Sequence, residues 1–349
     1  MDTLPISKET LKLFTGRDTE NKTLHKLLNI YNIAIIEGDY GIGKTSLGNY
    51  YRFNKDIFIT PLDEISTDVR WNTKEFLHEI LKGLVEYCEQ EKLFKKTNHM
   101  KVLRIRYGNL FSKDIDLNIM GNGVSYRENV ESSEIQTQSG LIYDLKQLSK
   151  LAIKEGKEII IQLNNLDMSL TDKKDIIHFF SQNRNIFQIP NVKWILTGSI
   201  GLSDLFSNEL KKFSSIIGKP LYLSNMSYES VSKLIDKRYK MKDDLKKKLV
   251  EDKENLRDII NILNIFKKED LKTKEKIKEY FDLFDFNEYE MEVLNYLKEK
   301  PMSIKDIADK VGKSYNSVNK RIKSLALKQA VRVERGSCTI QFEAYCSLF

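Results

Sequence analysis

The chain has 349 residues, 41% of them hydrophobic, so it can bury more than one core and is expected to form two or three domains. Its formal net charge is +7, and nine Lys or Arg against three Asp or Glu between Pro301 and Arg335 (9 − 3 = +6) carry most of that excess. The three cysteines are too few for a disulfide framework and have no metal-ligand spacing, and the absence of a signal-peptide core or a long apolar run predicts a cytoplasmic protein without membrane contact.

The first part of the chain alternates between two patterns. Apolar runs of strand length occur at 31–37, 56–60, 158–163, 193–198 and 220–224. Helix-length segments with apolar residues at three- and four-residue spacing lie between them, for example at 73–90 and 140–156. This alternation predicts an α/β domain with a mainly parallel sheet and helices on both faces, which we place at residues 1–218.

The first apolar run leads into a glycine-rich loop. Residues 38–45, GDYGIGKT, match the pattern G-x-x-x-x-G-K-[ST], and they stand between a predicted strand and a predicted helix, as this motif requires. Its glycines let backbone N–H groups turn toward phosphates, Lys44 adds a positive charge, and the Thr45 hydroxyl can bind Mg²⁺. We therefore predict a bound nucleoside triphosphate with Mg²⁺, held by Gly38, Asp39, Tyr40, Gly41, Ile42, Gly43, Lys44, Thr45 and Ser46.

The stretch from about 100 to 134 interrupts the alternation. Ile115, Leu117 and Ile119 recur at period two and are followed by Gly121-Asn122-Gly123. This pattern predicts a β-hairpin insertion. The insertion is either surface decoration or a surface for a protein partner or self-association, and both interpretations stay open.

After Ser224 the strands give way to helices. The segments 228–240, 243–252 and 255–268 all carry apolar residues at three- and four-residue spacing. They predict a small helical domain at 219–283. From 284 to 349 we expect two helices, a basic helix and two strands, VRVER and CTIQFEA, joined around Gly336.

The basic helix has two chemically different sides. It follows a short helix that begins at Ser303, whose spacing to Asp306 is a variant of the capping box. Within 314–328 the buried positions are expected to be Val318, Ile322 and Leu325, at i, i+4 and i+7. The side chains that then point outward are those of Tyr315, Asn316, Asn319, Lys320 and Lys323.

Those outward side chains suit DNA. Amides can read adenine edges, and lysines bind phosphate or guanine. Arg332 and Arg335 flank the tip of the predicted hairpin, so the segment resembles a winged helix-turn-helix, with double-stranded DNA as its expected partner. Winged helices also dock proteins, and that alternative stays open.

Taken together, the phosphate loop, the strand ending in LNNLD and the helical domain resemble the AAA+ and STAND superfamily of P-loop ATPases. Among its members the chain is most similar to the origin-recognition initiator and archaeal-ATPase branches, which carry a C-terminal winged helix. The resemblance covers almost the whole chain and implies ATP or ADP as the nucleotide and a helical lid over it. It also implies that the segment containing Arg17, which is similar to GR-x-x-E, passes beside the adenine, so that Arg17 would contact the nucleotide.

The resemblance assigns further roles. Thr197 or Ser199, at the end of KWILTGS, takes the sensor-1 position, where a hydroxyl orients water toward the γ-phosphate. Arg257, in the lid segment NLRDIINIL, takes the sensor-2 position over the phosphates. Thr197 could instead be a plain strand-end residue, and Arg257 a surface residue paired with Asp258 or Glu254.

Two departures from the family pattern affect catalysis. Asn164 and Asn165 stand where the family has a metal-binding and a water-activating carboxylate, and an amide cannot act as a carboxylate base. Asp167 could reach the metal only if the strand end bends, and is otherwise a loop or helix-capping carboxylate. Where relatives place an arginine finger this chain has Lys211 and Lys212, with Arg184 as a possible substitute or an ordinary surface residue.

We therefore expect a nucleotide-switched DNA-binding protein with weak or absent ATP hydrolysis, in which Arg257 senses the γ-phosphate and the lid orients the winged helix. Replication or transposition initiation, transcriptional control, and antiviral or other mobile-element defence are compatible with it. One alternative is a STAND-type signalling or scaffold ATPase whose winged helix docks protein. Another is an active remodelling ATPase, which the phosphate loop favours and the two asparagines oppose.

Overall fold

The computed structural model describes residues 5–65, 72–95, 97–108, 137–166, 173–213, 215–253, 255–281, 284 and 286–348. Contacts divide these residues between two compact units, Leu4–Ser224 and Asn225–Phe349. The chain passes from one unit to the other between Ser224 and Asn225, which we call the crossing point. The expected boundaries at 218 and 283 stay predictions.

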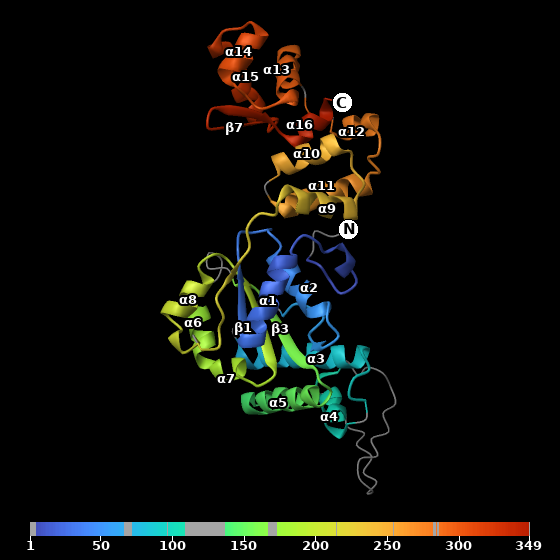
Figure 1. Cartoon of the computed structure of the whole chain (residues 1–349), viewed down its shortest axis with the longest axis vertical. Helices are drawn as coiled ribbons and strands as arrows, with labels where there is room; N and C mark the ends of the chain where they lie inside the picture. Colours follow the sequence, from blue (N-terminus) through green and yellow to red (C-terminus); the bar gives the residue numbers. More distant parts are fainter. Residues whose placement is uncertain are drawn as a thin grey trace. The chain divides into compact units, whose positions relative to one another are not determined.

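The first unit is built on a parallel five-stranded sheet (Figure 1). Its strands lie in the order β2-β3-β4-β1-β5, and every neighbouring pair is parallel. The predicted α/β fold is confirmed, with one strand in each of the five apolar runs. They are β1 (Ile33–Glu37), β2 (Phe58–Ile59), β3 (Glu158–Leu166), β4 (Val192–Gly198) and β5 (Leu221–Tyr222).

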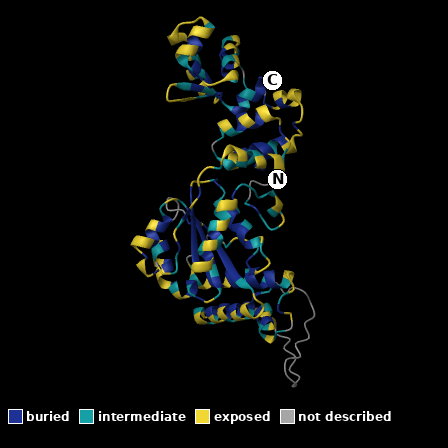
Figure 2. Ribbon diagram, in the orientation of Figure 1, coloured by how far each residue is buried: buried dark blue, intermediate teal, exposed yellow. Residues whose placement is uncertain are grey.

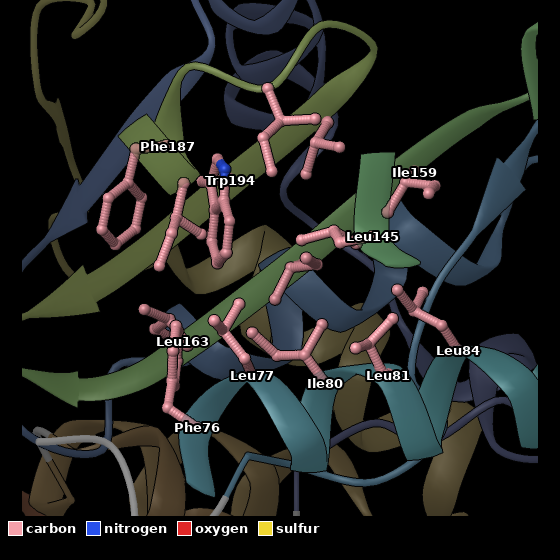
Figure 3. Close-up of a cluster of buried hydrophobic side chains, with 14 of the residues drawn as sticks. Phe76, Leu77, Ile80, Leu81, Leu84, Leu145, Ile159, Leu163, Phe187 and Trp194 are labelled. Carbon is pink, nitrogen blue, oxygen red and sulfur yellow. The ribbon is translucent and has the colours of Figure 1, made fainter. Parts of the chain in front are cut away.

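Both faces of this sheet are buried, which explains why its strands are almost uniformly apolar (Figure 2). Ile33 and Ile35 of β1 belong to the larger hydrophobic cluster, whereas Ala34 and Ile36 belong to the smaller one. Successive side chains of a strand point to opposite faces of the sheet, so one strand contributes side chains to both hydrophobic cores. Figure 3 shows part of the larger core, where α3 side chains such as Leu77 and Ile80 pack beneath the sheet near Trp194.

Helices cover each face. The smaller core is closed by α1 (Asp18–Ile30) and α2 (Lys44–Phe53). The larger core is closed by α3 (Thr73–Gln90), α4 (Asn98–Tyr107), α5 (Gln138–Lys154), α6 (Lys173–Gln182), α7 (Arg184–Phe187) and α8 (Leu202–Asn208). Short 3₁₀ turns, η1 (Leu11–Leu13) and η2 (Lys211–Phe213), complete the unit.

The start of the predicted hairpin insertion is helical. Residues 100–107 belong to α4, and the side chains of Met100, Leu103 and Tyr107 are buried in the larger core. Their three- and four-residue spacing places them on one helical face. The alternating residues Ile115, Leu117 and Ile119 lie outside the described residues.

The second unit begins with four helices around one hydrophobic core; the apolar spacing predicted the first three, and α12 was not predicted. They are α9 (Tyr228–Arg238), α10 (Asp243–Asp252), α11 (Leu256–Lys268) and α12 (Lys274–Phe281). A second core joins the remaining elements: α13 (Glu288–Glu299), β6 (Met302–Ser303), α14 (Ile304–Val311), α15 (Tyr315–Leu327), β7 (Val331–Glu334), β8 (Ser337–Ile340) and α16 (Phe342–Ser347). The strands form an antiparallel sheet in the order β6-β8-β7.

The last strand is shorter than the sequence predicts. The segment CTIQFEA was expected to be one strand, but β8 ends at Ile340 and α16 begins at Phe342. The helix is favoured because it buries two stripes at once. Phe342 and Cys346, four residues apart, enter the core of the four helices, and Ala344 and Leu348 enter the second core. The short strand β6, which the sequence pattern did not predict, pairs with β8.

No helix within the described parts of the chain has both the length and the apolarity needed to cross a lipid bilayer.

Candidate functional site

The phosphate loop has the predicted setting between a strand and a helix. β1 ends at Glu37, α2 begins at Lys44, and Gly43 is the N-cap of α2 with φ 98° and ψ 21°. This left-handed conformation favours glycine, because a Cβ would be strained there. The first turn of α2 directs its backbone N–H groups and the positive end of the helix dipole toward the loop, which is the local structure that binds phosphate.

The side-chain ammonium group of Lys44 lies against the backbone of the glycine-rich loop. Its Nζ donates hydrogen bonds to the backbone carbonyls of Gly38 and Asp39, both at 2.7 Å. These contacts hold the ammonium at the centre of the glycine-rich segment. A phosphate bound by the loop would therefore meet a positive charge that is already positioned.

Behind the loop, a polar cluster links α2 to two strands. Gln162 of β3 donates from Nε2 to the backbone carbonyl of Thr45 at 3.2 Å and to Asn164 Oδ1 at 2.7 Å. Thr197 of β4 donates its hydroxyl to the same Asn164 oxygen at 3.0 Å. Gln162, Asn164 and Thr197 are 4%, 8% and 0% exposed, so these three side chains are buried, and Thr45 is half-buried. We call Thr45, Gln162, Asn164 and Thr197 the amide cluster.

The structure thus brings three predicted site residues together, because the α2-facing positions of β3 and β4 alternate with period two. Gln162 was not predicted. The signal for it was available, because a lone amide two residues before Asn164 in a buried strand must share its face. Gln162 also lies close to Gly48 of α2, where an added Cβ would be 2.5 Å from Gln162 Oε1.

The two asparagines have different environments. Whereas Asn164 is buried in the amide cluster, Asn165 is exposed and has φ 56°. The strand pairing shifts at this point, since three residue steps on β3, from Leu163 to Leu166, match two on β4, from Leu196 to Gly198. Asn165 therefore lies in a β-bulge, and asparagine is among the residues that tolerate the left-handed conformation.

Glu37 is a buried carboxylate that the sequence reasoning missed. It stands at the end of β1, directly before the loop, and is 0% exposed. It accepts hydrogen bonds from the backbone N–H groups of Gly201, at 3.3 Å, and Ser203. Both belong to the start of α8, so Glu37 caps that helix and fixes the segment that follows β4. A glutamate ending an apolar strand was the available signal.

The amide cluster offers oxygen ligands only. Mg²⁺ prefers oxygen donors and keeps several waters, and the Thr45 hydroxyl and the Asn164 amide oxygen match that preference. No group of three or more His, Cys, Asp or Glu side chains that could hold a metal occurs among the residues that the structure describes. The chain would therefore hold Mg²⁺ through Thr45, water and the nucleotide phosphates, with Asn164 as a neutral neighbour. A bound Mg²⁺ would neutralise phosphate charge there.

Other predicted residues lie outside this cluster. Arg17 is buried and donates to the carbonyls of Ile42 and Ser224, and Ser46 accepts from the backbone N–H of Ile6. Ser199 is half-buried just after β4. Asp167 lies outside the described residues.

The cations considered as arginine-finger substitutes have different exposures. Lys211 and Lys212 are exposed in η2. Arg184 is the first residue of α7 and its Nε is buried, so its guanidinium is less accessible than that of an ordinary surface residue. Its use as a finger stays a prediction.

Arg257 belongs to the second unit. It lies in the first turn of α11, where its backbone N–H donates to the side chain of the N-cap residue Asn255 at 2.8 Å. Its predicted role at the phosphates stays a prediction.

The basic helix α15 has the two predicted sides. Val318, Ile322 and Leu325 are at most 1% exposed. The outward residues Tyr315, Asn316, Lys320 and Lys323 are exposed, and Asn319 is half-buried. In the wing, Arg335 has φ 47° in the turn before Gly336, and Arg332 pairs with Glu334 at 3.3 Å. We call these five residues of α15, with Arg332 and Arg335, the basic face.

Part of the basic segment is used internally. Glu290 of α13 is 1% exposed and accepts hydrogen bonds from Lys328 at 2.8 Å and Ser324 at 2.9 Å. Arg321 lies 3.6 Å from the same carboxylate. Burial would raise the pKa of Glu290, but the bonds from Lys328 and Ser324 outweigh it and hold this pKa below its usual value. Two of the nine Lys and Arg side chains between Pro301 and Arg335, those of Arg321 and Lys328, therefore anchor the basic segment to α13.

Comparisons with known proteins identify the carboxyl-terminal part most directly. Residues 282–346 match the family model described as sugar-specific transcriptional regulator TrmB. This segment contains α13, α14, α15 and the β7–β8 hairpin, which is the arrangement of a winged helix-turn-helix. No curated protein sequence matches the chain.

Solved structures resemble the chain over nearly its whole length. The Walker-type ATPase PABY2304 of Pyrococcus abyssi is 13% identical, with a TM-score of 0.48 and coverage of 99% of this chain and 98% of that one. Cdc6p from Pyrobaculum aerophilum is 12% identical, with a TM-score of 0.47 and coverage of 95% and 93%. The Aeropyrum pernix ORC2 protein is 12% identical, with a TM-score of 0.46 and coverage of 94% and 90%. At such identities no activity transfers to this chain.

The chain joins a parallel α/β core that carries the glycine-rich loop to a set of helices and a C-terminal winged helix that matches the TrmB family model.

Proposed function

We propose that this protein binds ATP with Mg²⁺ at the phosphate loop, hydrolyses it slowly or not at all, and uses the nucleotide state to control DNA binding by the winged helix. The amide cluster carries the proposal. Asn164 is held by Gln162 and Thr197 beside Thr45, where a P-loop ATPase needs a carboxylate. A neutral amide at Asn164 can keep the site ordered for binding, and Asn165, at the water-activating position, supplies no carboxylate base for the attacking water.

Contacts within the second unit support the proposal that a movement of the lid helices α9–α11 is transmitted to the winged helix. α16 places Phe342 in the core of the four helices and Ala344 in the core of the winged helix. Asp252 accepts the Phe342 backbone N–H at 3.0 Å, and Lys253 pairs with Glu343 at 2.8 Å. Because one helix is packed into both cores, a displacement of α9–α11 would carry the winged helix with it.

The basic face supports DNA as the partner. Lys320 and Lys323 are exposed on the side of α15 opposite to its buried stripe, with Asn316 beside them. Lysines along one face displace counterions from a duplex, and amides can contact base edges. The match of this segment to a transcriptional-regulator family favours transcriptional control over replication or transposition initiation and over mobile-element defence.

Binding and turnover can be measured separately. We expect the purified protein to retain or bind ATP and to release phosphate at less than about one turnover per minute. Lys44→Ala removes the charge over the loop and should abolish nucleotide binding. Turnover well above that rate, abolished by Lys44→Ala, would show an active ATPase instead.

DNA binding is tested by anisotropy of a labelled duplex at several salt concentrations, with ATP, with ADP and without nucleotide. We expect Lys320→Ala with Lys323→Ala to weaken binding and to lower the salt slope by about 2, since each lost phosphate contact removes about one released counterion. Lys154→Ala, an exposed lysine of α5, is the matched control. Unchanged affinity and an unchanged salt slope in the double variant would exclude the basic face as the DNA-binding surface.

One observation favours the alternative of a protein-docking winged helix. Leu327, the last residue of α15, is 87% exposed, and Val333 of the wing is 43% exposed. Exposed aliphatic side chains suit a protein interface better than a phosphate backbone. If duplex binding is undetectable at low salt, a signalling or scaffold function becomes the better proposal.

A further inference from the structure

The guanidinium of Arg17 joins two parts of the first unit that are far apart in sequence. Its NH2 donates to the backbone carbonyls of Ile42 at 3.2 Å and Ser224 at 2.8 Å, and NH1 pairs with Glu20 at 2.7 Å. Arg17 is 5% exposed. A buried guanidinium needs these acceptors, because losing one would leave a desolvated N–H group without a hydrogen bond.

The two carbonyls belong to functionally distinct places. Ile42 lies in the phosphate loop, directly before the N-cap Gly43. Ser224 is the last residue of the first unit, so the chain leaves for the winged-helix unit immediately after it. A single nitrogen therefore connects the nucleotide loop to the crossing point.

Independent contacts bring the same two places together. The backbone N–H of Leu223 donates to the Glu37 carbonyl at 2.7 Å, and a Cβ on Gly38 would lie 2.8 Å from the Leu223 carbonyl. The Ile42 side chain is 5% exposed and belongs to the same hydrophobic cluster as Leu223. The loop thus packs directly on the residues that precede the crossing point, and a change in one alters the packing of the other.

We propose that Arg17 is a positioning residue that transmits the state of the phosphate loop to the crossing point, and through it to the winged-helix unit. When the loop rearranges around phosphates, the Ile42 carbonyl moves, and the guanidinium follows it or loses a bond. The same nitrogen also donates to the Ser224 carbonyl, so two arrangements of the loop would give two arrangements of the chain at the crossing point. This inference rests on the proposed nucleotide switch, and it differs from the adenine-facing role that the family resemblance implies for Arg17.

The test compares nucleotide affinity with nucleotide-dependent movement in the full chain. Surface cysteines are introduced as Lys154→Cys in the first unit and Glu279→Cys in the second, both at exposed positions, and carry a pair of spectroscopic labels. The native cysteines Cys88, Cys338 and Cys346 are buried, which directs labelling to the new thiols. The distance distribution is recorded without nucleotide, with ADP·Mg²⁺ and with ATP·Mg²⁺. A fluorescent ATP analogue gives the affinity.

We expect Arg17→Ala to keep nucleotide affinity within about tenfold of the parent, since the loop retains its own backbone donors and Lys44. The ATP-dependent change in the distance between the two labels should fall to less than about half of the change in the parent protein, because the link between the phosphate loop and the crossing point is lost. Arg17→Lys should give an intermediate change, since an ammonium cannot reproduce the forked geometry. Arg104→Ala, which removes an arginine paired with Glu89 in the same unit, should behave like the parent.

The outcomes separate the two claims. A full distance change in Arg17→Ala overturns the coupling role and leaves the switch intact. Loss of nucleotide affinity in parallel with the distance change shows that Arg17 only supports the loop, which also overturns it. A parent protein that binds ATP but shows no distance change overturns the proposed switch itself. If Arg17→Ala does not fold, as judged by its melting temperature, Arg17→Lys decides, and its complete retention of the parent change counts against the proposal.

Discussion

Thr197 of β4 donates its hydroxyl to the amide oxygen of Asn164 of β3 across 3.0 Å. Gln162 donates to the same oxygen at 2.7 Å and also holds the first turn of α2 through the Thr45 carbonyl. Asn164, at the predicted metal-facing position, is therefore a hydrogen-bonded amide in a network that ties α2 to two strands. This arrangement supports a site that is ordered for binding.

Removal of the Thr197 hydroxyl tests that order. We expect Thr197→Val to lower the free energy of unfolding by about 1 kcal/mol, because Asn164 loses one of its two observed donors in a buried place. A unit of this size should then melt about 2–4 °C lower. Thr197→Ser keeps the hydroxyl and is the matched control. Equal melting temperatures for the valine variant and the parent would contradict the role of this bond.

Restoring a carboxylate at the bulge tests whether the rest of the catalytic site is present. We expect Asn165→Glu to raise ATP turnover at least about tenfold, because a carboxylate can polarise the attacking water where an amide cannot. The variant should also be less stable by about 1 kcal/mol, since glutamate tolerates the left-handed φ of 56° less well than asparagine. Asn165→Gln has the same length without the charge. If phosphate release stays at the parent rate in Asn165→Glu, the missing carboxylate at this position is not the cause of slow hydrolysis.

A single methyl group at Gly48 should disturb the amide cluster from the helix side. Its Cβ would lie 2.5 Å from Gln162 Oε1 and 2.8 Å from Nε2, so Gln162 would have to move and release Thr45 or Asn164. We expect Gly48→Ala to weaken Mg²⁺·ATP binding about tenfold and to lower the melting temperature. Gly140→Ala in α5, where the nearest atom would be at 3.4 Å, should do neither. Unchanged binding in Gly48→Ala would show that the cluster is dispensable.

The buried carboxylate of Glu290 should make the attachment of α15 sensitive to acid. The folded-state pKa is lowered, so its stabilising effect is complete above the unfolded value of about 4.3 and is lost as pH falls through the lower folded value. Hydrogen exchange of α15 amides should therefore accelerate at acidic pH. In Glu290→Gln we expect faster exchange near neutral pH and a weaker acid dependence. The same acid dependence in both proteins would exclude Glu290 as the titrating group.

Much of this protein follows from local sequence. The five apolar runs and the glycine-rich loop specify a parallel sheet and the strand-loop-helix setting of the predicted phosphate site, because strand burial and loop conformation depend on residues close in sequence. The spacing of Val318, Ile322 and Leu325 likewise determines which side of α15 is outward. The substitution of Asn164 and Asn165 for carboxylates is visible in the sequence alone.

Tertiary structure decided how those residues are used. The sequence pattern does not separate Asn164 from Asn165, but the bulge against β4 buries one and exposes the other. The contacts of Glu37 with the α8 N-terminus and of Arg17 with Ile42 and Ser224 could not be predicted, because these partners are backbone groups far away in the chain. The segment after Ile340 became a helix because two separate cores each needed one of its stripes. Such partners are set by packing between distant segments, and residue spacing alone does not determine them.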